Sequence, residues 1–198
     1  MSKAQYSNRL SIAQSGKCIP YGHSAEPRAD GSMNYGFLNL KAEPELALEV
    51  PELLIDSELM RLVCLVNDPE SMFFTVGCTS GDVADALGYR RAGYIEFVLN
   101  SREHVAKAST YFPLFFEFDR FLATRELRWQ VAYDWELMGA SFLDAGIEGF
   151  TCAVFVNTHY LPTRTEAQES WAKSIEYLSS FLSKYRGMQL DYIYTSGV

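Results

Sequence analysis

The stretch over residues 92–126 constrains the fold of this chain more than any other. A β-rich run over 94–99 passes through Asn100 and Ser101 into a helical pattern that Pro113 interrupts. Beyond the proline, four phenylalanines occur within seven residues, namely Phe115, Phe116, Phe118 and Phe121. Aromatic area of this size is either buried or covered by a partner. We expect burial, of Phe112, Phe115 and Phe118 in particular, because a bare patch would cause aggregation.

The remaining periodicity predicts an α+β fold. Apolar runs over 59–66, 73–78 and 150–156 and a clean alternation over 131–137 are typical of strands. Thr163 and Glu166 form a capping box at the start of a long amphipathic helix. We therefore predict a single domain over residues 42–198, with a mixed β-sheet of about five to seven strands packed against two main helices.

Residues 1–41 differ from the rest of the chain in their pattern. They are polar, contain several Gly and Pro residues, and show no sustained period of 2 or 3.6. We predict an irregular polar N-terminal arm.

The charge of the chain limits its partners. The 198 residues carry a formal net charge of −8, with a pI near 4.9. Binding to nucleic acid or to an anionic membrane needs clustered Lys and Arg, so neither is predicted as a partner. Residues 1–41 have a balance of +3, which leaves −11 for the remainder. Such an acidic body either steers a basic partner or serves solubility alone.

The acidic charge is densest within residues 42–60, which contain no Lys or Arg. Six acids alternate there with apolar residues: Glu43, Glu45, Glu49, Glu52, Asp56 and Glu58. This pattern is typical of a solvated face or of a docking surface for a basic partner. We take these six residues as the candidate partner-binding residues.

Cysteine usage and hydropathy suggest the compartment. The four cysteines lie far apart without a CxxC pair, and Cys64, Cys78 and Cys152 sit in apolar runs typical of buried free thiols. We see no signal peptide and no apolar run of about 20 residues. The reducing cytoplasm is the expected location.

Chemical motifs are scarce. The sequence lacks GxGxxG, GxxxxGK[ST], HExxH and GxSxG, so we predict no catalytic residue, metal site or cofactor. A nucleophilic pair of Cys78 or Cys152 with His104 or His159 is disfavoured, because both thiols lie on runs predicted to be buried. Thr79, Ser80 and Asp82 follow a predicted strand and can form an anion-binding turn. With His159, they are the residues of a possible pocket.

Several landmarks appear in the order found in suppressor-of-fused-like domains, over roughly residues 59–180. They are Phe73-Phe74-Thr75 with Thr79-Ser80-Gly81, Ile95-Glu96-Phe97-Val98-Leu99, Phe112-Pro113, Trp135, Gly139-Ala140-Ser141, Phe150 to Val156, and Leu161-Pro162 with Glu166. The chain resembles that family in this order of motifs. It departs from the family at Ala140, where the family has a histidine.

The resemblance implies a non-catalytic protein-binding module. Bacterial members of the family are inferred to be immunity proteins that neutralise toxins, and the acidic body would suit a basic toxin domain such as a nuclease. Two alternatives remain open at this point. One is an enzyme of unknown reaction with a small-molecule pocket, and the other is an oligomeric scaffold that uses Phe115 to Phe121 as an interface.

Overall fold

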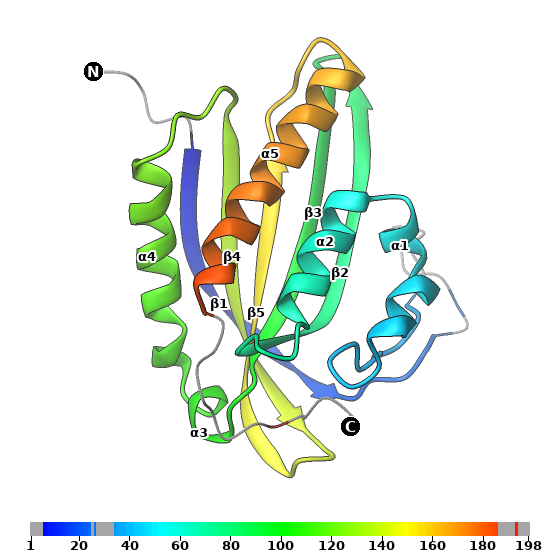
Figure 1. Cartoon of the computed structure of the whole chain (residues 1–198), viewed down its shortest axis with the longest axis vertical. Coiled ribbons are helices and arrows are strands. Elements are labelled where there is room, and N and C mark those ends of the chain that lie inside the picture. The colour runs from blue at the N-terminus through cyan, green and yellow to red at the C-terminus, as the bar shows by residue number, and fades with distance from the viewer. Residues whose placement is uncertain (1–5, 25, 27–33, 186–192, 194–198) are drawn as a thin grey trace.

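One open β-sheet organises the chain (Figure 1). The computed structural model describes residues 6–24, 26, 34–185 and 193. The five strands are β1 (Tyr6–Ile19), β2 (Phe73–Asp85), β3 (Gly88–Leu99), β4 (Val131–Phe142) and β5 (Ile147–Thr158), in the spatial order β1-β4-β5-β3-β2. Strand β1 runs parallel to β4, and the other neighbours are antiparallel. The prediction of an α+β domain with a mixed sheet is confirmed.

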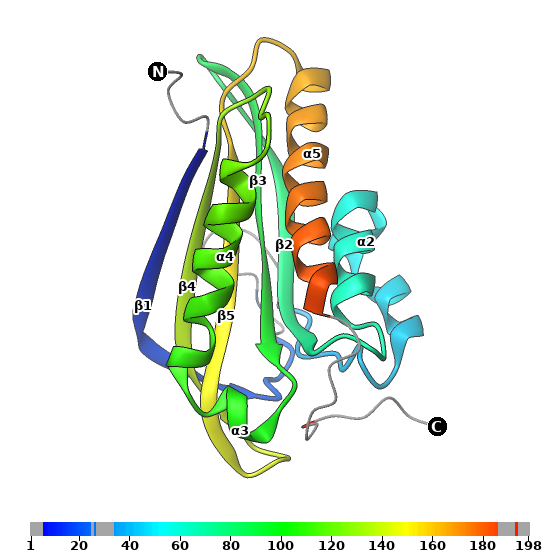
Figure 2. The ribbon, with the colours of Figure 1, turned by 60° about the vertical axis from the view of Figure 1, so that its left-hand side comes forward.

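The three longer helices lie together on one face of the sheet (Figure 2). They are α2 (Ser57–Val66), α4 (Phe112–Ala123) and α5 (Arg164–Leu182). Short helical segments join the larger elements: η1 (Pro44–Glu49), α1 (Pro51–Leu54), α3 (Arg102–Val105), η2 (Ala108–Thr110) and η3 (Ser183–Tyr185). Helix α5 begins as the capping box predicts, since the Thr163 hydroxyl accepts a hydrogen bond from Glu166 N at 3.2 Å.

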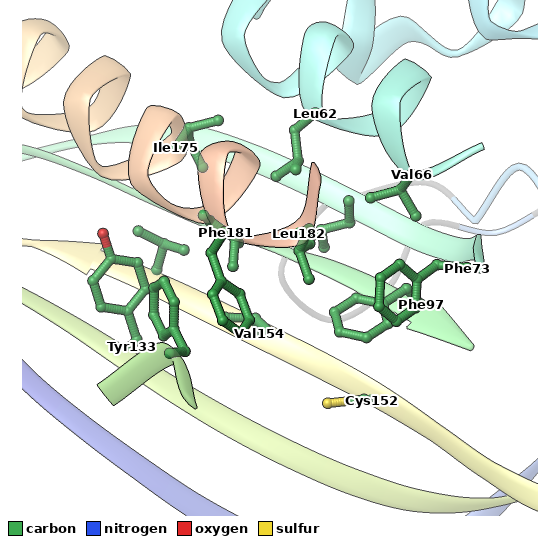
Figure 3. Close-up of a cluster of buried hydrophobic side chains, with 14 of the residues drawn as sticks. Leu62, Val66, Phe73, Phe97, Tyr133, Cys152, Val154, Ile175, Phe181 and Leu182 are labelled. Carbon is green, nitrogen blue, oxygen red and sulfur yellow. The ribbon is translucent and has the colours of Figure 1, made fainter. Parts of the chain in front are cut away.

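The main core fills the layer between these helices and the sheet (Figure 3). Ile175, Phe181 and Leu182 of α5 point toward the strands, where Tyr133 and Val154 meet them. A smaller core lies on the opposite face, where the ends of β1 and β4 pack on β2 and β3 through Ile19, Phe74, Val98 and Phe142. The helices and the main core therefore lie on one face of the sheet, and the opposite face carries the smaller core at one end.

Helix α2 corrects the expectation of a strand over 59–66. Its buried residues, Leu59, Leu62, Val63 and Val66, follow the 3–4 spacing of a helix. Asp56 starts the helix by accepting hydrogen bonds from the backbone N–H groups of Glu58 and Leu59. A continuous apolar run does not distinguish a strand from a buried helix. Here the N-cap at Asp56 is the feature that favours the helix.

Strand β1 corrects the expectation of an irregular arm over residues 1–41. Tyr6–Ile19 forms the edge strand beside β4, with a register irregularity between Ile12 and Gly16. An edge strand buries few side chains, and the irregularity interrupts the period, so the sequence carries no clear alternation. The prediction also covered 1–5, 25 and 27–33, which lie outside the described residues.

The phenylalanine stretch is partly buried. Phe118 and Phe121 belong to the main core, and the Phe118 ring packs on those of Tyr133 and Phe181. Phe112 and Phe115 are half-buried, and Phe116 is 57% exposed. The expected burial is thus correct for Phe118 and too strong for Phe112 and Phe115, because α4 lies at the edge of the helical layer beside β1. In the described part of the chain, no helix is both long and apolar enough to cross a membrane.

Candidate protein-binding surface

Residues 43–58 form one exposed surface that we call the acidic surface. Pro44 and Pro51 occupy the first turns of η1 and α1, where a missing N–H costs nothing. Ala47 and Leu53 are buried and fix the segment to the domain. The carboxylates of Glu43, Glu45 and Glu49 are exposed, and Glu52 and Glu58 are half-buried. Five of the six predicted partner-binding acids therefore lie at or near solvent.

Large apolar side chains accompany these carboxylates at the surface. Leu48 is 67% exposed, Leu54 is 62% exposed and Ile55 is 74% exposed. Single exposed apolar residues are ordinary, but here three occur within eight residues of the chain, among acidic side chains. Exposed apolar side chains rimmed by polar groups are common at protein–protein contact sites.

Asp56 is separated from the other five acids by burial. Its carboxylate accepts hydrogen bonds from Ser80 Oγ at 2.6 Å and from Trp171 Nε1 at 2.8 Å, and it pairs with the Arg91 guanidinium at 3.3 Å. Gly93 lets α5 come this close, because a Cβ there would lie 2.8 Å from the Trp171 ring. Asp56 thus joins α2, α5 and the sheet, and it is buried rather than part of the exposed surface.

The predicted pocket residues are distributed over separate sites. The Ser80 hydroxyl is bound to Asp56, and Asp82 pairs with Arg91 at 3.1 Å and with Arg164 at 3.5 Å. Thr79 lines a cavity that neither Ser80 nor Asp82 lines. His159 is exposed beyond the end of β5, in a different cavity lined by Tyr6 and Gln130 among others. Strand β2 also continues past the predicted turn to Asp85.

The cavity at Thr79 adjoins the acidic surface. It has a volume of about 100 Å³ and lies beside β2, the last strand of the sheet. Glu52 and Val50 belong both to the acidic surface and to the cavity wall. The tyrosines Tyr21, Tyr35 and Tyr94 also line it. The acidic surface is therefore continuous with a small aromatic hollow.

The cysteines are not arranged for nucleophilic chemistry. Burial, with the carboxylates of Glu52 and Asp56 as lesser causes, raises the pKa of the Cys78 thiol to about 12. Burial also raises the pKa of Cys152 well above its ordinary range. Cys64, which we expected to be buried, is exposed on α2 together with Cys18 on β1. In the part of the chain that the structure describes, no group of three or more His, Cys, Asp or Glu residues could hold a metal ion.

Two features of the site were missed from the sequence. The exposed positions of Leu48, Leu54 and Ile55 follow from the short helical turns, and the two prolines were the available signal for those turns. The tyrosine-lined cavity brings Tyr21, just after β1, against the hairpin of β2 and β3, and these two segments are far apart in the sequence. Residue types alone carry no signal for it.

Comparison with known proteins gives no relative. The chain matches no family model, no curated protein and no solved structure.

Proposed function

We propose that this chain is a non-catalytic protein-binding module that binds a basic protein through the acidic surface. The single observation that carries the proposal is the exposure of Leu48, Leu54 and Ile55 among carboxylates, in a segment over residues 42–60 that contains no Lys or Arg. Apolar groups supply the area that drives association, and the carboxylates supply long-range attraction and specificity.

The charge of the chain supports a cationic partner. The acidic surface has five exposed or half-buried glutamates. Among the described residues, only Arg61 pairs with one of them, and its partner is Glu58. The other carboxylates are therefore available to a partner's Lys and Arg side chains. A toxin domain that acts on nucleic acid belongs to this basic class, and neutralising such a toxin in the reducing cytoplasm is the biological role that we propose.

The test is a binding assay with the products of the neighbouring genes. The purified chain is immobilised, and association and dissociation rates are measured at low and high ionic strength. We expect the association rate to fall steeply with salt, because exposed charges are screened. Binding that is indifferent to salt, or no binding by any neighbouring product, contradicts the proposal.

A pair of matched variants locates the contact. Glu45→Lys with Glu49→Lys reverses two carboxylates of the acidic surface. Glu126→Lys with Asp144→Lys makes the same change in net charge at two exposed positions elsewhere. The first variant should slow association by about tenfold or more, and the second should change it far less. Equal losses in both variants would show that net charge alone matters.

A further inference from the structure

We propose that the cavity beside β2 binds the cationic end of one lysine or arginine side chain of the partner. This inference rests on the proposed function, since the cavity opens beside the acidic surface, and it assigns a specific chemistry to one position within that surface.

The cavity has the size of a single side chain. Its volume is about 100 Å³. Pockets for cofactors or drug-sized ligands measure roughly 300–1,000 Å³. The end of one long side chain therefore fits, whereas a cofactor does not.

The wall favours a positive group. Glu52 is the one charged side chain among the described residues that line the cavity. Three tyrosines, Tyr21, Tyr35 and Tyr94, supply aromatic rings, whose faces attract ammonium and guanidinium groups. The Tyr21 ring already has such a neighbour, because Lys17 Nζ lies 6.0 Å from its centroid. Lys17 itself does not fill the cavity, since it pairs with Glu96 at 2.5 Å.

The edge of β2 adds a hydrogen-bond acceptor. The backbone N–H and C=O of Tyr89 both bond to Leu161, which follows β5, so these groups point toward the β5 side of β3. The direction alternates along a strand, so the N–H and C=O of Ile95 also point toward β5. Cys78 stands opposite Ile95, so its C=O and N–H point away from β3, toward the outer edge of the sheet. Nearer the start of β2, side chains satisfy this edge: Lys41 binds Phe73 O, Asn67 binds Thr75 N and Tyr21 binds Val76 O. At Cys78, the outer edge of β2 lies against the cavity instead of against such side chains.

An ammonium group in the cavity would thus meet a carboxylate, a carbonyl and aromatic rings. Lysine and arginine need hydrogen-bond acceptors and negative charge when they leave water, and this combination provides both. Burial is the main cause that raises the pKa of the Cys78 thiol, and the carboxylates of Glu52 and Asp56 raise it further. The apolar lining of Leu38, Leu40 and Val50 suits the methylene stem of the same side chain.

The experiment uses the full chain and two small probes, Nα-acetyl-lysine amide and its neutral analogue Nα-acetyl-norleucine amide. Binding is followed by NMR through the backbone amide shifts of Glu52, Gly77 and Thr79. We expect saturable shifts with the lysine probe and affinity at least about tenfold weaker for the norleucine probe, because only the former carries the charge. Equal affinity of the two probes, or shifts that lie elsewhere, overturns the assignment.

Variants separate this inference from the proposed function. Glu52→Gln keeps the shape and removes the charge, and it should weaken binding of the lysine probe about tenfold. Glu126→Gln, at an exposed position outside both the cavity wall and the acidic surface, should leave that binding unchanged. Tyr94→Leu should weaken the lysine probe more than the norleucine probe. If neither probe binds while the partner still depends on Glu45 and Glu49, the cavity assignment fails and the proposed function stands. If the lysine probe binds and no basic partner does, the proposed function fails instead.

Discussion

The carboxylate of Asp56 accepts a hydrogen bond from the indole N–H of Trp171 at 2.8 Å, across 115 residues of sequence. The same carboxylate starts α2 and pairs with Arg91 of β3. One buried side chain therefore fixes the positions of two helices and the sheet relative to one another. Since the acidic surface leads directly into α2, this contact also determines where that surface lies.

Replacement of Asp56 should destabilise the domain strongly. Asp56→Ala leaves the Arg91 guanidinium, the Trp171 indole and the Ser80 hydroxyl without their shared acceptor. Breaking a buried ion pair by removing one partner costs about 3–5 kcal/mol, so we expect a loss of that size in the free energy of unfolding. Urea unfolding measures it. Glu49→Ala on the exposed part of the surface is the control and should change stability by no more than about 0.5 kcal/mol; a similar loss in both variants would refute the structural role of Asp56.

Helix α4 offers a matched pair of phenylalanines. Phe118 is fully buried among aromatic rings, and Phe116, two residues earlier, is 57% exposed. Phe118→Ala should lower the free energy of unfolding by about 3–5 kcal/mol, because it removes buried area and leaves a cavity. Phe116→Ala should cost less than about 1 kcal/mol. Denaturant unfolding of both variants tests the burial, and comparable losses would show that α4 presents a different face to the core.

Helix termini and clean periods were predictable from the sequence. Thr163 with Glu166 and the alternation over 131–137 gave the correct elements, because both depend on contacts within a few residues. The assignment of 59–66 failed because a continuous apolar run has no period, and the strand over Tyr6–Ile19 failed because its pairing comes from β4. The acids of the candidate surface were visible in the sequence. The burial of Asp56 among them was not, because its partners Ser80, Arg91 and Trp171 come from distant segments.

Lys41 should be essential for the start of β2. Its ammonium is buried and donates hydrogen bonds to the carbonyls of Asp68 and Ser71, both at 2.6 Å, and to that of Phe73 at 3.1 Å. Burial lowers its pKa to about 8, so the group is still largely protonated at neutral pH. Lys41→Met keeps the length of the side chain and leaves the three carbonyls without their hydrogen-bond donor. We expect the free energy of unfolding to fall by about 3 kcal/mol or more at pH 7.

Thermal and urea unfolding of Lys41→Met give the size of this effect. Lys107→Met is the control, since Lys107 is exposed and its ammonium pairs with Glu103 at 3.1 Å. An exposed ion pair contributes about 0–1 kcal/mol, so this variant should stay close to the unsubstituted chain. Equal stability of the two variants would mean that water satisfies the three carbonyls when Lys41 is absent.

Tyr111 should make the domain sensitive to alkaline pH. Its hydroxyl is buried, accepts a hydrogen bond from Leu99 N at 3.1 Å and donates one to Phe150 O at 2.7 Å. Burial raises the pKa of this phenol above its ordinary value of 10.0. The folded state therefore holds a proton that the unfolded state loses above about pH 10, so the contribution of Tyr111 to stability is complete below that pH and falls as the pH rises beyond it.

Tyr111→Phe isolates this contribution. Urea unfolding is measured at pH 8.5 and pH 11 for the unsubstituted chain and for the variant. At pH 8.5 the variant should be less stable by about 1–3 kcal/mol, because Leu99 N loses its acceptor. Between the two pH values, however, its stability should fall by about 1.4 kcal/mol less than that of the unsubstituted chain, the value of one pKa unit. Tyr89→Phe, at a partly exposed ring on β3, provides the comparison; if the Tyr111→Phe variant loses as much stability between pH 8.5 and pH 11 as the unsubstituted chain does, the buried phenol does not control the alkaline response.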